Sequence, residues 1–220
     1  MIKVTYIDHM GSDLSVVNAA RVSFGKTSEM DMSDQWGPPK LKEKDAKLIK
    51  YLAKHKHMSP FNHTFLTVHV KAPIFVARQL QKHEYMPWNE ISRRYSTEKI
   101  FFYEPDYWRD KSKDKKQGSG GKSQSQYFPN IYVKEVAEKA LGDYKKMLTQ
   151  GIAPEQARMI LPQNMMTEWY WSGTVGAFAK MCNLRCKPDT QLETRIVGNE
   201  VSDIMLRYFP VSWEALRHDY

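Results

Sequence analysis

The sequence predicts an α+β fold, in which helices flank a central, mostly antiparallel sheet within a single domain covering residues 1–220. Segments typical of strands and of helices are interspersed along the chain without a regular strand–helix–strand repeat. The chain has 220 residues, of which 41% are hydrophobic and 26% charged, so it can bury one full core.

The N-terminal quarter contains one strand and two helices in this interpretation. Residues 2–7 alternate between apolar and polar side chains, which is typical of a short strand. Ser12 or Asp13 can cap a helix over residues 14–21, where the apolar spacing is close to 3.6. The same spacing predicts a second helix over about residues 41–55.

The next segments predict a strand, a helix and a further strand. Residues 64–71 are rich in β-branched and aromatic side chains, which favours a strand. Pro73 is suited to the first turn of a helix that continues to about residue 83. Pro87 ends that helix, and an extended strand is expected near residues 99–103.

Residues 109–126 are rich in Lys, Ser, Gly and Gln, and their low complexity predicts a mobile loop. The Gly-Ser-Gly-Gly-Lys-Ser run at residues 118–123 resembles part of a phosphate-binding loop. However, the first glycine of that motif would have to stand at position 116, which is Lys116, and no strand precedes it. The phosphate-binding loop is therefore rejected.

The C-terminal half is predominantly helical in this interpretation. A long helix is predicted over about residues 129–149, with an apolar core stripe formed by Val133, Val136, Ala140, Tyr144, Met147 and Leu148. The aromatic run at residues 165–171 lacks alternation, which predicts a strand buried on both faces. Helices are predicted over residues 173–183 and from a cap at Asp189 to about residue 208.

Charge and hydropathy limit the function classes. The net charge of +8 suits nucleotides or nucleic acid, but much of the surplus lies in the lysines of residues 111–116. No segment approaches the roughly 20 apolar residues that span a bilayer, and residues 1–7 do not resemble a signal peptide. A cytoplasmic protein without a membrane partner is expected.

The two cysteines do not indicate a metal site. Cys182 and Cys186 are four residues apart, but no cluster of His or Cys lies beside them to complete a zinc site. Neither stands in an activating motif, so unreactive thiols and no bound metal are expected.

The most informative stretch is residues 78–96. It combines cationic, acidic, amide, hydroxyl and aromatic side chains directly after an apolar run, as a pocket for an anionic, aromatic ligand requires. The alternative is a polar helix end followed by a loop. Arg158 and Arg185 stand among apolar neighbours, so each either meets an anionic ligand or forms a partly buried salt bridge.

A family resemblance becomes visible at Lys82-His83-Glu84, which is followed by seven residues and then Ser92. This pattern resembles the motif of the flavin-dependent thymidylate synthases (the ThyX family), which usually has Arg-His-Arg, seven residues and Ser. Further segments resemble the family in the same order: residues 18–24, 57–63, 70–79, 157–158 and 183–185, and Gln191 with Glu193.

The resemblance implies an α+β enzyme that methylates deoxyuridylate (dUMP) to thymidylate. Methylenetetrahydrofolate would supply the carbon, and FAD reduced by NADPH would supply the hydride. It further implies a homotetramer with active sites shared between subunits, and no nucleic-acid partner. The family needs no cysteine nucleophile, which agrees with the setting of the two cysteines.

The resemblance also assigns roles to individual residues. Arg185 is the expected catalytic residue, because it would stabilise negative charge on the uracil ring. The residues expected to bind the nucleotide are Gln79, Glu90, Ser92, Arg94, Arg158 and Arg185. The residues expected to bind the flavin are Ser23, His57, Ser59, Lys82, His83, Glu84, Glu90, Thr174 and Lys180. Ser92 has no adjacent base, so it is assigned to binding.

The chain departs from the family pattern mainly on the flavin side. Lys82 and Glu84 stand where the family has arginines, and Thr174 and Lys180 stand where it usually has asparagines. Lys180 could offset the charge of Glu84, and Trp88 could stack on a ring. Two alternatives therefore stay open: methylation or hydroxymethylation of another pyrimidine nucleotide, and a nucleic-acid-binding protein that uses residues 111–122.

Overall fold

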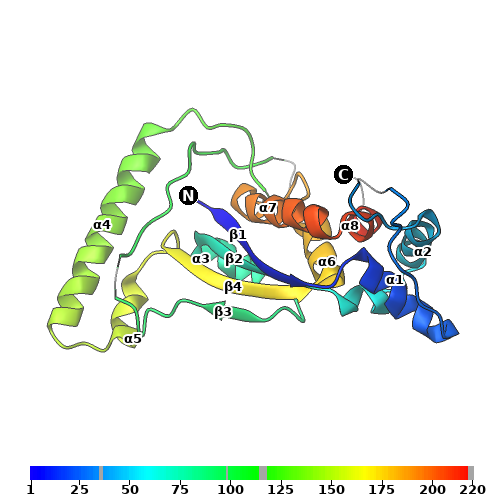
Figure 1. The fold of residues 1–220 in the computed structure, drawn as a ribbon. Helices are drawn as coiled ribbons and strands as arrows, with labels where there is room; N and C mark the ends of the chain where they lie inside the picture. Colours follow the sequence, from blue (N-terminus) through cyan, green and yellow to red (C-terminus); the bar gives the residue numbers. More distant parts are fainter. Residues whose placement is uncertain (35–36, 98, 114–117, 218–220) are drawn as a thin grey trace.

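Four antiparallel strands form one sheet with helices around it, which confirms the predicted α+β class (Figure 1). The computed structural model describes residues 1–34, 37–97, 99–113 and 118–217. The strand order is β1-β2-β4-β3, and every neighbouring pair is antiparallel. The strands are β1 (Lys3–Met10), β2 (Phe65–Pro73), β3 (Trp88–Glu90) and β4 (Met166–Thr174).

The helices occupy three regions around this sheet. Their bounds are α1 (Asp13–Arg21), α2 (Glu43–Lys54), α3 (Ile74–Leu80), α4 (Tyr127–Thr149), α5 (Pro154–Ala157), α6 (Val175–Arg185), α7 (Leu192–Tyr208) and α8 (Pro210–Leu216). Three 3-10 helices are η1 (Val22–Phe24), η2 (Ser59–His63) and η3 (Arg158–Ile160). Figure 1 shows α1, α2 and α8 at one end of the sheet, and α4 with α5 at the other. Helices α3 and α7 pack on the strands between these ends.

The sheet is buried on one face, and this corrects the prediction for β4. Trp169 and Trp171 are 1% exposed, whereas Tyr170 between them is 50% exposed. Strand β2 follows the same alternation, with Leu66 and Val68 fully buried. The opposite face carries polar groups such as the Lys71–Glu168 ion pair.

Helix α4 also differs from its prediction. Of the six residues in its expected core stripe, only Tyr144 is buried. Val136 is 43% exposed, and Tyr132, one turn earlier, is 57% exposed. The helix stands away from the sheet and contacts α5 and η3 (Figure 1), so its apolar side chains do not reach the core.

Several element ends are shifted. Residues 99–103 form no strand, only an isolated bridge between Phe102 and Met165. Pro73 is the last residue of β2 and the N-cap of α3, rather than a first-turn residue, and α3 ends at Leu80. The cap of α7 is Gln191 and not Asp189.

The predicted mobile loop at 109–126 includes residues 114–117, which lie outside the described residues. In its described part, Asp110 and Gly121 pair through their backbones, and Ser123 N–H donates to the carbonyl of Trp108. Within the described ranges, no helix is both long and apolar enough to cross a membrane.

Candidate active site

A cleft of about 1430 Å³ lies beside the C-terminal ends of α2 and α6. The turn after α3 (residues 82–85), the loop before η2 and the end of α8 complete its walls. Six cationic side chains line it, namely Lys50, Lys54, Lys56, Lys82, Lys180 and Arg185, against two acidic ones, Glu84 and Glu214. The cleft is therefore suited to an anionic ligand.

Arg185 lies at the end of α6, and its guanidinium is fixed by two acceptors. Its Nε donates to Nε2 of His83 at 3.1 Å, and its Nη2 donates to the carbonyl of Gln79 at 3.1 Å. Burial lowers its pKa. Within the described part of the chain no carboxylate pairs with Arg185, so the salt-bridge alternative for this residue is wrong.

His83 is neutral at physiological pH in this setting. Burial, followed by the charges of Arg185 and Lys180, lowers its pKa to about 4. Because Nε2 accepts the hydrogen bond from Arg185, the ring proton resides on Nδ1. A neutral acceptor orients Arg185 without neutralising its charge, so that charge stays available to a ligand.

This depressed pKa predicts a specific dependence of stability on pH. Between about pH 4 and 6.5 the unfolded chain binds more protons at His83 than the folded chain does. The free energy of unfolding should therefore rise with pH across this window and reach its full value above it. Urea unfolding of the wild type and of His83→Gln at several pH values measures the difference. Parallel pH profiles for the two proteins would contradict the assignment.

Residues predicted to bind flavin gather at this cleft, with exceptions. Lys82, His83, Glu84, Thr174 and Lys180 line it. Nζ of Lys180 lies 4.0 Å from a carboxylate oxygen of Glu84, so the two departures from the family pattern form one ion pair. His57 and Ser59 are exposed on either side of Met58, which lines the cleft, whereas Ser23 in η1 does not line it.

A second group of predicted residues lies elsewhere. Nε of Arg94 is 3.5 Å from the carboxylate of Glu155, and Nε of Arg158 donates to the carbonyl of Glu155 at 3.3 Å. The hydroxyl of Ser92 accepts from the backbone N–H of Arg94. Figure 1 shows α5, which contains Glu155, well separated from α6, which ends at Arg185. One chain therefore does not bring the two groups together.

Glu90 and Trp88 are engaged within the chain. The carboxylate of Glu90 accepts from the hydroxyl of Thr167 at 2.6 Å and from the indole N–H of Trp88 at 3.1 Å. The ring of Trp88 stacks on Trp169, with centroids 4.3 Å apart. The ring on which Trp88 stacks is therefore that of Trp169.

Gln79 holds Arg185 through its backbone, while its side chain faces α7. Its Nε2 donates to Gln191 at 2.5 Å, and its Oε1 accepts from Thr194 at 3.1 Å. Gln191 in turn donates to Glu193. A hydrogen-bonded path therefore runs from Glu193 through Gln191 and Gln79 to Arg185, although Gln191 and Glu193 do not line the cleft.

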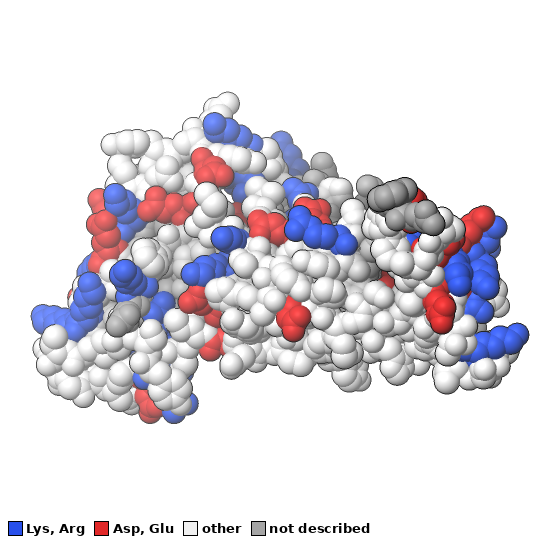
Figure 2. Space-filling model, in the orientation of Figure 1, with Lys and Arg blue, Asp and Glu red and all other residues white. Residues whose placement is uncertain are grey.

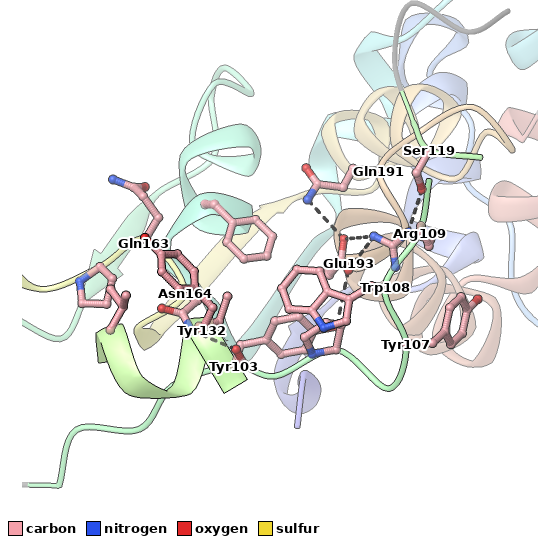
Figure 3. Close-up of a pocket in the computed structure, with 15 residues that line it drawn as sticks. Tyr103, Tyr107, Trp108, Arg109, Ser119, Tyr132, Gln163, Asn164, Gln191 and Glu193 are labelled. Carbon is pink, nitrogen blue, oxygen red and sulfur yellow. Dashed lines mark hydrogen bonds and ion pairs between the residues drawn. The ribbon is translucent and has the colours of Figure 1, made fainter. Parts of the chain in front are cut away.

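Glu193 and residues of α4 line a second, smaller cavity of about 430 Å³ (Figure 3). Aromatic side chains, including Tyr103 and Tyr132, line it. Arg109 donates to both oxygens of Glu193, at 2.7 and 2.9 Å, as the dashed lines in Figure 3 show. Burial, followed by the charge of Glu193, raises the pKa of Tyr103 to about 12. None of the residues predicted to bind nucleotide or flavin lines this cavity.

Several cleft residues were missed by the sequence interpretation, namely Lys50, Lys54, Lys56, Asn62 and Tyr85. Asn62 accepts a hydrogen bond from the Thr174 hydroxyl, which also caps α6. The available signal was the spacing of Lys50 and Lys54, which places both on one face of the predicted helix over residues 41–55.

The cysteines differ in their surroundings. Burial raises the pKa of Cys182. A hydrogen bond with Cys182, followed by the charge of Arg217, lowers the pKa of Cys186 to about 7. That both thiols are unreactive stays a prediction. Among the described residues, no group of three or more His, Cys, Asp or Glu side chains could hold a metal ion.

Comparison with known proteins gives consistent results. The model of the family described as "Thymidylate synthase complementing protein" matches residues 5–211. A flavin-dependent thymidylate synthase of Thermus thermophilus is 39% identical over 212 residues, which cover 96% of this chain and 74% of the relative. That of Thermotoga neapolitana is 34% identical, covering 96% and 89%.

Solved structures extend the similarity to the fold. The UMP/dUMP methylase PolB from Streptomyces cacaoi, bound with 5-Br dUMP, is 31% identical with a TM-score of 0.83, over 98% of this chain and 94% of that chain. Its structure with 5-Br UMP gives a TM-score of 0.82 at the same identity, covering 98% and 93%.

Proposed function

Since this chain belongs to the family of flavin-dependent thymidylate synthases and is an enzyme of that family, we propose that it methylates dUMP to thymidylate. Methylenetetrahydrofolate supplies the carbon, and FAD reduced by NADPH supplies the hydride. The observation that carries the proposal is Arg185, a cation held by a neutral histidine at a cationic cleft.

The cleft fits a flavin dinucleotide. Its volume of about 1430 Å³ accommodates a ligand larger than most drugs, and its cationic lining suits a diphosphate. Tyr85, whose side chain is 90% exposed, offers an aromatic ring at the same cleft. The residues of this cleft would hold the flavin, and the protein would position and polarise the pyrimidine.

Arg185 stabilises the negative charge that builds up in the N3–C2 region of the pyrimidine ring as the ring is activated, before C5 attacks the one-carbon unit. Nε of Arg185 is engaged by His83, and Nη2 by the carbonyl of Gln79, so the orientation of the guanidinium plane is fixed before the nucleotide binds. A guanidinium keeps its charge throughout, and its planar fork matches the edge of a pyrimidine.

Ser92, Arg94 and Arg158 bind the nucleotide phosphate, since guanidinium groups bind phosphate oxygens through paired hydrogen bonds. These residues lie beside exposed apolar side chains, among them Tyr95 (82% exposed) and Met159 (75% exposed). At the N-terminal end of α4, a second exposed set consists of Tyr127, Phe128 and Tyr132, all more than half exposed. Such a surface favours a homotetramer in which one subunit supplies this group to the Arg185 cleft of another.

A second candidate substrate is uridylate. It is favoured by the similarity to a protein described as a UMP/dUMP methylase, which extends over 98% of this chain. Membership of an enzyme family favours both substrates over the alternative of a nucleic-acid-binding protein that uses residues 111–122.

Product analysis separates these possibilities. The protein is incubated with FAD, NADPH and labelled methylenetetrahydrofolate, together with either dUMP or UMP. Labelled thymidylate from dUMP, and none when folate is omitted, is the expected result. A labelled 5-methyl product from UMP would show that UMP is also a substrate. A labelled 5-hydroxymethyl product would show that the reaction is hydroxymethylation and not methylation. Absence of any labelled pyrimidine, with flavin retained, would contradict the proposal.

A further inference from the structure

One wall of the cleft is formed by lysines that the family motif does not include. Lys50 and Lys54 lie four residues apart on α2, so their side chains share one face of that helix. Lys56 follows two residues after the helix ends. All three line the cleft, facing the turn that carries Lys82, His83 and Glu84. Figure 2 shows cationic side chains gathered at the end of the molecule where α2 lies.

These lysines form no ion pair with either of the two carboxylates, Glu84 and Glu214, that line the same cleft. Glu84 is occupied by Lys180. Within the described residues, Lys50, Lys54 and Lys56 have no ion-pair partner. By contrast, Lys47 on the same helix pairs with Glu43 at 2.7 Å and does not line the cleft. Two like charges spaced four residues apart destabilise a helix slightly, so this arrangement favours an anionic ligand.

Backbone geometry supports the same location. Lys56 has φ 56° and Tyr85 has φ 58°, which place both residues in the left-handed region. In the described part of the chain, only one further non-glycine residue, Lys99, has a positive φ. Strained backbone of this kind concentrates at ligand-binding sites, and both Lys56 and Tyr85 line this cleft.

We propose that Lys50, Lys54 and Lys56 bind the diphosphate of the flavin dinucleotide. The isoalloxazine ring of the flavin has to lie beside Arg185 and His83, where the pyrimidine binds. The diphosphate of the same cofactor then extends toward α2. Compact ammonium groups on flexible stems suit the oxygens of a diphosphate. The inference rests on the proposed flavin-dependent function. The three lysines would supply the positive charge that is lost because Glu84 stands where the family pattern has an arginine.

The test compares two double variants with the same change in charge on the same helix. Lys50→Ala/Lys54→Ala removes two cleft lysines, and Lys44→Ala/Lys47→Ala removes two lysines that do not line the cleft. Alanine favours helix, so both variants are expected to fold, which thermal unfolding checks. Affinities for FAD and riboflavin are measured by flavin fluorescence, and the affinity for ADP by calorimetry.

The expected result is that the cleft variant binds FAD and ADP about tenfold more weakly at low salt, while its riboflavin affinity is unchanged. The control variant should match the wild type for all three ligands. Unchanged FAD affinity in the cleft variant, or an equal loss in the control or for riboflavin, would overturn this inference alone. A wild-type protein that binds no flavin would overturn both this inference and the proposed function.

Discussion

Replacing Arg185 with alanine is expected to lower kcat by roughly 10²–10³-fold, the loss typical of removing a group that stabilises developing negative charge. The cleft keeps five other cationic side chains, so flavin should still bind to the variant. His83 and the carbonyl of Gln79 lose a shared donor, but His83 lines a cleft that water can enter.

Steady-state kinetics and flavin absorbance are measured together on this variant. Arg185→Lys retains the charge but loses the planar fork, so it should recover only part of the rate. Arg195→Ala is a matched control, since Arg195 is an arginine on α7 that donates to the carbonyl of Pro188 and does not line the cleft. Wild-type turnover in Arg185→Ala, or loss of flavin together with turnover, would contradict the assigned role.

Local patterns predicted the elements whose environment is set by their own sequence. The strand over residues 64–71 and the helix capped at Ser12 were predicted correctly, because alternation and capping act over a few residues. Helix α4 was predicted in position but not in environment. An apolar stripe has the same period whether it faces a core or a partner subunit, so the sequence could not show that Tyr132 and Val136 are exposed.

The family motif predicted individual residues of the candidate site. It did not predict which of these residues lie close together in the folded chain. Arg185 and His83 meet through a hydrogen bond across 102 residues of sequence. Arg94 and Arg158 meet instead at Glu155. Spacing along the chain carries no information about such long-range contacts. The cleft lysines Lys50 and Lys54 were missed for a related reason, since exposed lysines on a helix are usually only solvated.

Mixing two inactive variants is expected to restore activity if each active site is shared between subunits. Arg158→Ala removes a residue proposed to bind the nucleotide phosphate, and Arg185→Ala removes the proposed catalytic residue, so each variant alone should be nearly inactive. If the two residues that meet at one site come from different subunits, a hybrid of both variants contains some sites with neither substitution. In a randomly mixed hybrid, about a quarter of the sites should be intact.

The decisive measurement is the dUMP-dependent oxidation of reduced flavin, in the presence of methylenetetrahydrofolate, by hybrids carrying two different affinity tags. The two variants are co-expressed, and chains bearing both tags are purified together. The hybrid is expected to regain a substantial fraction of wild-type activity, while each parent variant stays nearly inactive. A hybrid that binds flavin, contains both chains and remains as inactive as its parents would contradict the shared site.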